Sequence, residues 1–74
     1  MAMITPQSKQ YPYTVVLYYD SYPLMHIGQA EHWANTEIDD KSTWTTYSDI
    51  TVRVGRIFEF KNLDDWVNFK LTWL

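Results

Sequence analysis

The segment FEFKNLDDWVNFKLTWL, residues 58–74, decides the fold because it joins a strand pattern directly to a helix pattern. Phe58 and Phe60 are separated by one charged residue, which is the period of a strand with one apolar face. Asn62 is a suitable N-cap, and the Asp64–Asp65 pair lies in the first helical turn, where carboxylates interact favourably with the helix dipole. We therefore expect a β-strand followed by a helix that begins after Asn62.

The predicted C-terminal helix carries more apolar side chains than one packing face needs. Its apolar arc is about 200° wide on a helical wheel, compared with the roughly 100° that packing on a sheet requires. The residues that we expect to form the core stripe are Leu63, Trp66, Val67, Leu71 and Leu74. Phe69 and Trp73 lie one turn apart on the flank of that stripe, so we predict that these two side chains contact a partner or a second copy.

A first strand is predicted over residues 11–20, YPYTVVLYYD, which are rich in β-branched and aromatic side chains. The alternation divides the side chains between two faces, with Tyr13, Val15, Leu17 and Tyr19 on one and Thr14, Val16 and Tyr18 on the other. Both faces are largely apolar, which indicates an interior strand or a strand covered by a partner. Tyr18 therefore joins Phe69 and Trp73 as a candidate interface residue.

Residues 21–38 carry a helical pattern. Apolar side chains recur at steps of three and four residues, at Leu24, Ile27, Ala30, Ala34 and Ile38. Ser21 is the expected N-cap, and Pro23 is tolerated in the first turn because its missing N–H would be unpaired there. Gly28 weakens such a helix by about 1 kcal/mol relative to alanine, so a second strand over residues 24–29 stays open as the alternative.

A β-hairpin is predicted between residues 43–47 and 50–60, after a polar loop at residues 39–42. The longer strand has one apolar face, formed by Ile50, Val52, Val54, Phe58 and Phe60. Gly55 interrupts this strand, which predicts a bulge or a bend.

The order strand–helix–strand–strand–helix predicts an α+β domain, in which a small antiparallel sheet has the helices on one face. The alternative is an Sm-like small β-barrel of short strands with one helix. Residues 11–74 are expected to form a single small domain. Residues 1–10, which include Pro6 and several polar residues, are expected to form a flexible N-terminal tail.

The composition limits how the domain is stabilised and what it binds. The chain has 74 residues and no cysteine but four tryptophans, six tyrosines and three phenylalanines, so aromatic side chains rather than disulfides supply the buried surface. A net charge of −3 disfavours binding to nucleic-acid phosphates. No apolar run reaches about 18 residues and no signal peptide is evident, so we expect a cytoplasmic protein.

The residues that usually carry catalysis or metal binding form no motif. His26 and His32 are six residues apart. Two metal ligands on the same face of a helix are usually about four residues apart. The Asp39–Asp40 and Asp64–Asp65 pairs lie where loops and helix starts use aspartate structurally, and no base, nucleophile and oxyanion donor can be named together. We expect a protein that is not an enzyme and binds neither a cofactor nor a metal.

A sheet face that binds single-stranded RNA is the alternative to a protein interface. Aromatic side chains stack on bases and arginines neutralise phosphates, and Tyr18, Trp44, Arg53 and Arg56 could share a sheet. The competing interpretation places Tyr18 and Trp44 in the core or at an interface and leaves the arginines in solvent. Six basic residues against nine acidic ones favour this second interpretation.

The C-terminal pattern F-x-F-x-N-x-x-D-x-x-x-F-x-L-x-W resembles the ending of short uncharacterised proteins of marine tailed phages, cyanophages especially, and of ocean metagenomes. The matching residues are Phe58, Phe60, Asn62, Asp64, Asp65, Phe69, Leu71 and Trp73. Trp66 stands where a small residue is expected. The resemblance implies a viral origin, and with it the host cytoplasm. The group has no known activity, so the resemblance gives no catalytic residues for this chain.

Taken with the excess of aromatic side chains, the resemblance leads us to expect a phage-type accessory or protein–protein interaction module that acts as a homo-oligomer. Through one relative of this general kind, the resemblance also implies an Sm-like barrel that assembles into a ring. The alternative function is therefore an Sm-like or sheet-face module for single-stranded RNA.

Overall fold

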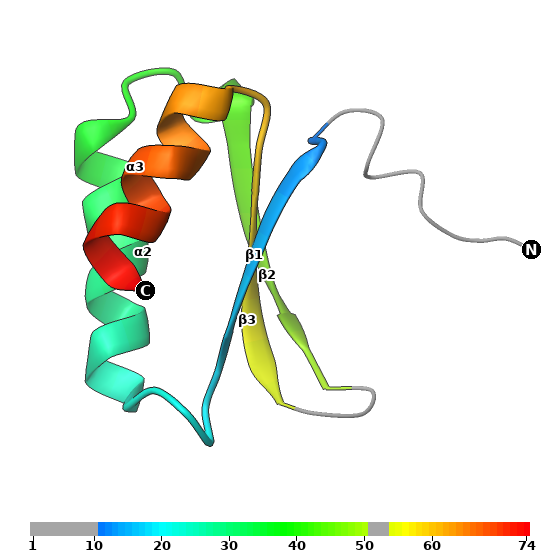
Figure 1. Cartoon of the computed structure of the whole chain (residues 1–74), viewed down its shortest axis with the longest axis vertical. Coiled ribbons are helices and arrows are strands. Elements are labelled where there is room, and N and C mark those ends of the chain that lie inside the picture. The colour runs from blue at the N-terminus through cyan, green and yellow to red at the C-terminus, as the bar shows by residue number, and fades with distance from the viewer. Residues whose placement is uncertain (1–10, 51–53) are drawn as a thin grey trace, which may run out of the picture.

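The structure is a computed structural model that describes residues 11–50 and 54–74. Its elements follow the predicted order, and their bounds are β1 (Tyr13–Tyr18), α2 (Leu24–Glu37), the short 3₁₀ helix η1 (Lys41–Thr43), β2 (Trp44–Asp49), β3 (Gly55–Phe60) and α3 (Leu63–Trp73). The strands form one layer, and α2 and α3 form a second layer on one side of it (Figure 1). The predicted α+β class, with helices on one face of an antiparallel sheet, is confirmed.

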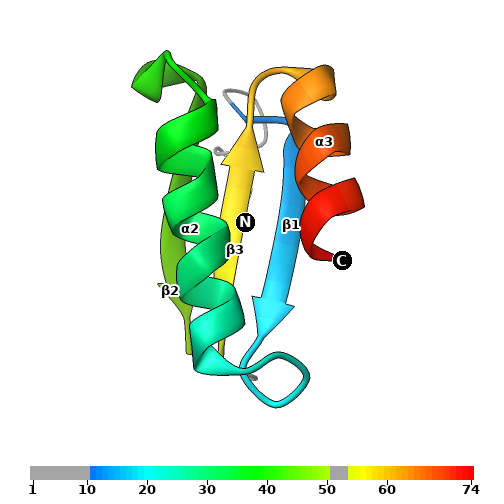
Figure 2. The ribbon, with the colours of Figure 1, turned by 90° about the vertical axis from the view of Figure 1, so that its left-hand side faces the viewer.

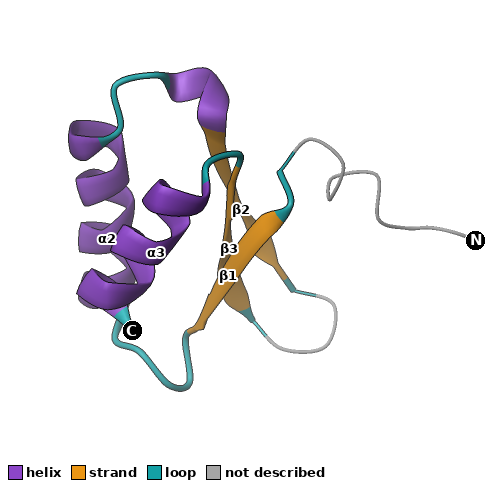
Figure 3. Cartoon of the chain, turned by 45° about the horizontal axis from the view of Figure 1, so that its top comes forward, coloured by secondary structure: helices purple, strands orange, loops and turns teal. Residues whose placement is uncertain are grey.

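The central strand of the sheet is β3, because the strand order is β1-β3-β2 and both neighbours run antiparallel to it. Phe58 pairs with Val15 of β1 and with Thr46 of β2, so these side chains share the face that the helices cover. The sheet is open, with β1 and β2 at its edges, and is not the closed barrel of the alternative prediction. Figure 2 shows α2 over β2 and β3 and α3 over β1, and Figure 3 shows both helices on the same side of the strands.

Phe69 of α3 is the side chain that joins the helices to the sheet. It is completely buried, and its ring centroid lies 4.7 Å from that of Phe58 and 5.3 Å from that of Phe60. The ring of Trp33 of α2 meets it edge to face, with the centroids 5.9 Å apart. One ring therefore contacts the central strand and the second helix at once, which places it at the centre of the core.

Of the core stripe predicted for α3, only Trp66 packs against the core, and the other four residues are exposed, because the helix is rotated relative to the expected orientation. Trp66, Phe69 and Trp73 pack against the core. The other apolar side chains of the segment are exposed by 49% at Leu63, 37% at Val67, 81% at Leu71 and 61% at Leu74. The aromatic side faces the sheet because three large aromatic side chains remove more apolar surface from water than the leucines and the valine do.

The predicted helix over residues 21–38 is confirmed as α2, and the alternative strand over residues 24–29 is wrong. The buried residues of this segment are Ile27, Ala30, Ala34 and Ile38. Leu24, by contrast, is 72% exposed. The N-cap is Pro23 rather than the predicted Ser21, because the Ser21 N–H donates to the carbonyl of Tyr18 in the turn before the helix.

The predicted hairpin forms between β2 and β3, but β3 is shorter than expected. It begins at Gly55, Ile50 and Val54 are exposed in the connection, and Val52 lies outside the described residues. Gly55 pairs in regular register with Tyr18, so it starts a strand and does not form a bulge. A Cβ atom at Gly55 would lie 2.9 Å from Cδ1 of Tyr18, so the missing side chain leaves room for the tyrosine ring.

The outer side of β1 has most of its carbonyl groups occupied. Alternate residues of an antiparallel edge strand turn their N–H and C=O groups outward. In β1 the carbonyls of Thr14 and Tyr18 bond outside the sheet, so the outward residues are Thr14, Val16 and Tyr18. The Thr14 carbonyl accepts a hydrogen bond of 3.1 Å from Nε1 of Trp66. The Tyr18 carbonyl accepts hydrogen bonds from the turn that leads into α2. These bonds fasten α3 and the turn to the edge of the sheet.

The rotation of α3 predicts opposite outcomes for two residues in the same helix. Phe69→Ala removes a completely buried ring and should lower the free energy of unfolding by about 3–5 kcal/mol. Leu71→Ala truncates an exposed side chain and should change it by less than about 0.5 kcal/mol at concentrations where the protein is monomeric. Urea denaturation followed by far-UV circular dichroism measures both values, and equal losses would contradict this orientation of the helix.

The two glycines should respond oppositely to alanine. A Cβ atom at Gly28 would have no neighbour within 4 Å, so Gly28→Ala should raise the free energy of unfolding by about 0.8–1 kcal/mol through helix propensity alone. Gly55→Ala forces a Cβ atom against the Tyr18 ring and should be destabilising. Thermal unfolding of the two variants tests both signs, and a stabilising Gly55→Ala would contradict the described contact.

Candidate functional site

The outer side of α3 carries a contiguous apolar surface that no described residue covers. We call it the α3 outer stripe, and it consists of Leu63, Val67, Leu71 and Leu74. Their spacings of four, four and three residues place them within an arc of about 80° on a helix of 3.6 residues per turn. Four aligned aliphatic side chains on three turns form the kind of surface that packs against another helix.

The α3 outer stripe lies on the side of α3 that points away from α2. Trp66 reaches the edge of β1, as its bond to Thr14 shows. Next to Trp66 around the helix is Lys70, whose Nζ lies 3.4 Å from the centroid of the indole ring. The stripe follows beyond Lys70 on the helical wheel, so the fold places it beside the β1 edge, where α2 cannot cover it.

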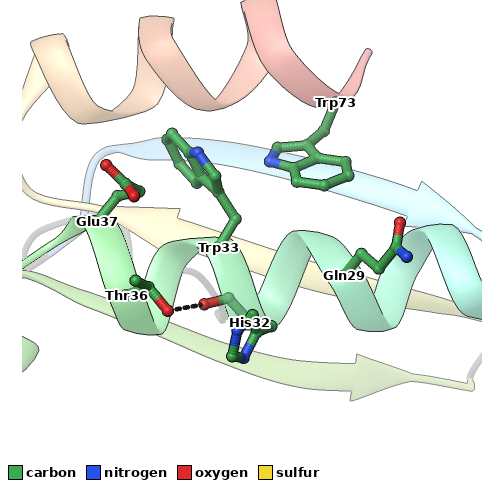
Figure 4. A pocket seen from close by; sticks show the side chains of 6 residues that line it. All are labelled: Gln29, His32, Trp33, Thr36, Glu37 and Trp73. Carbon is green, nitrogen blue, oxygen red and sulfur yellow. Dashed lines mark hydrogen bonds between the residues drawn. The ribbon is translucent and has the colours of Figure 1, made fainter.

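A shallow cleft of about 350 Å³ lies between α2 and the C-terminal turn of α3. Its lining residues are Gln29, His32, Trp33, Thr36, Glu37 and Trp73. Trp33 and Trp73 are half-buried and form the apolar floor, with their ring centroids 6.5 Å apart and their planes at 72° (Figure 4). The nitrogen-bearing edge of Trp73 faces Trp33, and its buried Nε1 has no hydrogen-bond acceptor among the described residues. The indole N–H therefore points at an aromatic face.

His26 holds the end of α3 that forms one wall of the cleft. Its Nε2 lies 2.8 Å from the carbonyl oxygen of Trp73, and its ring meets the Trp73 indole edge to face at 5.3 Å. The ring of Tyr22 stacks on the same imidazole, with the ring centroids 5.0 Å apart. This histidine is thus a structural contact between the helices.

The face of the sheet opposite the helices contains one buried carboxylate. Glu59 is 5% exposed and pairs across the sheet with Thr14 and Thr45. Its Oε2 accepts a hydrogen bond of 2.8 Å from the hydroxyl of Tyr47, whereas Oε1 accepts none from the described residues. Burial, and after it the hydrogen bond to Glu59 and the negative charges of Glu59 and Asp49, raise the pKa of Tyr47 to about 12.

The three side chains predicted to contact a partner do not form one surface. Phe69 is completely buried, so it presents nothing to a partner. Trp73 is half-buried in the cleft between α2 and α3. Tyr18 lies on the opposite face of the sheet, against Gly55. The excess apolar arc was a correct signal of an exposed surface, but that surface is the α3 outer stripe.

The candidate nucleic-acid contacts are not brought together either. Trp44 is buried on the side of the sheet that the helices cover. Arg56 lies on that same side, where its Nε donates to Thr46 Oγ1 at 2.9 Å and its Nη2 lies 3.6 Å from Glu31 Oε2. Arg53 is outside the described residues. The arginine and the tryptophan are therefore engaged within the fold.

One aspartate from each of the two acidic pairs is engaged in a local hydrogen bond. Asp40 caps η1, and hydrogen bonds from the hydroxyl and the N–H of Ser42 lower the pKa of its carboxyl group. Asn62 is the N-cap of α3, as predicted, but its side-chain oxygen accepts no hydrogen bond from the N–H groups of the first turn. Its amide nitrogen instead donates to the carboxylate of Asp65. Residues 11–50 and 54–74 contain no group of three or more potential metal ligands and no helix able to span a membrane.

Sequence reasoning missed Trp33, which is central to the cleft. The signal was present, because Gln29, Trp33 and Glu37 recur at intervals of four residues and must share one side of α2. The predicted core stripe drew attention to the neighbouring side of the helix. No protein-family model, curated protein or solved structure matches the chain.

The Tyr47–Glu59 pair predicts a loss of stability in alkali. Because the folded pKa of Tyr47 is raised from about 10 to about 12, its contribution is complete below pH 10 and is lost as the pH rises toward 12. The free energy of unfolding should fall less between pH 9 and pH 11 in Tyr47→Phe than in the unsubstituted protein. Tyr19→Phe, which removes a hydroxyl from the other face, is the control. Equal slopes in the protein and in Tyr47→Phe would show that this phenol is not retained in its neutral form.

Proposed function

We propose that this protein is a protein–protein interaction module that acts as a homo-oligomer, and that copies meet through the α3 outer stripe. The observation that carries the proposal is the exposure of four aligned aliphatic side chains, of which Leu71 is the most exposed at 81%. Apolar surface that is contiguous on a small domain marks an interaction site, whereas single exposed apolar residues need no such explanation.

A second copy is the occupant that fits this surface. The stripe runs along one side of an eleven-residue helix with steps of four, four and three, which is close to the seam of paired helices. The identical stripe on another copy has a matching length and spacing, so a twofold axis brings the two into register. A domain of this size also gains stability from association, because a single small core contributes only a few kcal/mol.

The side chains that flank the stripe are compatible with a solvated rim. Asp64 and Asn68 lie on one side of it and are exposed, while Lys70 lies on the other side with its ammonium group over Trp66. Polar residues around an apolar centre are the usual arrangement of an interface. The lysine is already engaged within its own chain, so it does not oppose the approach of a second helix.

The proposal is tested by Leu71→Ser with Leu24→Ser as the matched control. Both leucines are more than two-thirds exposed, but Leu24 lies at the start of α2 and outside the stripe. Burying a leucine contributes about 1.5–3 kcal/mol, so Leu71→Ser should raise the dissociation constant by about tenfold or more. Leu24→Ser should leave it unchanged. Size-exclusion chromatography with multi-angle light scattering at several concentrations gives these constants.

Two results would contradict the proposal. A protein that stays monomeric at high micromolar concentration does not use the stripe for self-association. Equal weakening by Leu71→Ser and Leu24→Ser would place the contact elsewhere.

A further inference from the structure

The cleft between α2 and α3 has its charge at one end and its aromatic surface in the middle. Glu37 stands beside Trp33, Trp73 follows, and Gln29 lies at the far end (Figure 4). From Gln29 to Glu37 the helix advances by about 12 Å, at 1.5 Å per residue. The cleft is therefore elongated, with a carboxylate at one end, two indole rings between, and an amide at the other.

The carboxylate of Glu37 has no counter-ion within the described residues. It is exposed, and none of residues 11–50 and 54–74 makes an ion pair or a hydrogen bond with its side chain. Glu37 is also the last residue of α2, whose final turn contains no basic residue, so it adds to the negative end of the helix dipole. The nearest lysine in sequence, Lys41, donates its ammonium group to the carbonyl of Asn35. Lys41 thus offsets the dipole at the end of α2, and among the described residues the carboxylate of Glu37 is left available to a second cation.

From this juxtaposition we infer that the cleft binds an alkylammonium group, of the kind that a lysine side chain presents. The ammonium group lies against the ring of Trp33 within the field of Glu37, because aromatic faces and carboxylates both attract organic cations. The alkyl chain covers Trp73, and Gln29 offers hydrogen bonds to the amides of a peptide. Anionic ligands are repelled by Glu37.

The test uses the full chain labelled with ¹⁵N and follows the indole N–H signals of its four tryptophans. The probe is N-acetyl-lysine methylamide, and N-acetyl-norleucine methylamide is the neutral ligand of nearly the same shape. The lysine compound should shift the signals of Trp33 and Trp73, while the signal of Trp66, which is bonded to Thr14, stays in place. Norleucine should bind about threefold to tenfold more weakly, because it lacks the charge.

Substitutions at the end of α2 test the role of the carboxylate. Glu37→Gln should weaken binding of the lysine compound by about threefold. Asp39→Asn removes the same charge two residues further on, from an exposed position outside the cleft, and should leave binding unchanged. Both changes are on the surface, so both variants should fold.

A third ligand, n-butylammonium, separates the two sources of the same chemistry. Weaker binding than the lysine compound would indicate a lysine within a peptide, and equal binding would indicate a free amine; either outcome supports the proposed site. The proposal is overturned if norleucine binds as tightly as lysine, if Glu37→Gln and Asp39→Asn have equal effects, or if no saturable shift occurs below about 100 mM ligand. None of these measurements depends on the α3 outer stripe, because no stripe residue lines the cleft.

Discussion

The packing of Phe69 against Phe58 and Phe60 is the contact on which the rest of the structure depends. It fixes the rotation of α3 about its axis, since a helix that directs this ring into the sheet must turn the opposite residues outward. The leucines of the α3 outer stripe are exposed as a consequence. The same rotation brings Trp73 beside Trp33 and so creates the cleft. Two candidate sites on different sides of one helix thus have a common physical origin.

The sequence was sufficient for the order of the elements because their local signals are strong and mutually consistent. Each local signal indicates one type of element. The alternation of side chains indicates the strands β1 and β3, the apolar stripe that includes Ile27 indicates α2, and the aspartates after Asn62 indicate the start of α3. When apolar residues cover more than half of a helix's circumference, the local pattern does not determine which side of the helix faces the sheet. In α3 either side satisfies the periodicity, and the choice depends on the rings that the sheet presents to it. That information comes from residues far away in the chain, so Phe69 and Leu71 were assigned to the wrong sides.

The candidate sites were only partly visible for a similar reason. The width of the apolar arc in α3 correctly indicated surplus apolar surface, but not its position. The cleft needs two helices to meet, and neither Trp33 nor Trp73 alone shows that the two rings lie 6.5 Å apart. Arg56 and Trp44 resembled a nucleic-acid contact in the sequence, yet the pairing of β2 with β3 puts both on the covered side of the sheet. Which face a strand residue occupies follows from the register and the helices together.

The bond from Trp66 to the Thr14 carbonyl has a consequence for how copies of this chain behave when crowded. An edge strand with unoccupied carbonyls is a template on which another chain can add a strand, and such growth has no natural end. In β1 the indole and the turn before α2 have taken two of the three outward carbonyls. Docking of a strand at this edge would have to break bonds that the monomer already makes. At the β1 edge, neighbouring molecules can therefore meet only through side chains, and such contacts separate more readily than strands joined by backbone hydrogen bonds.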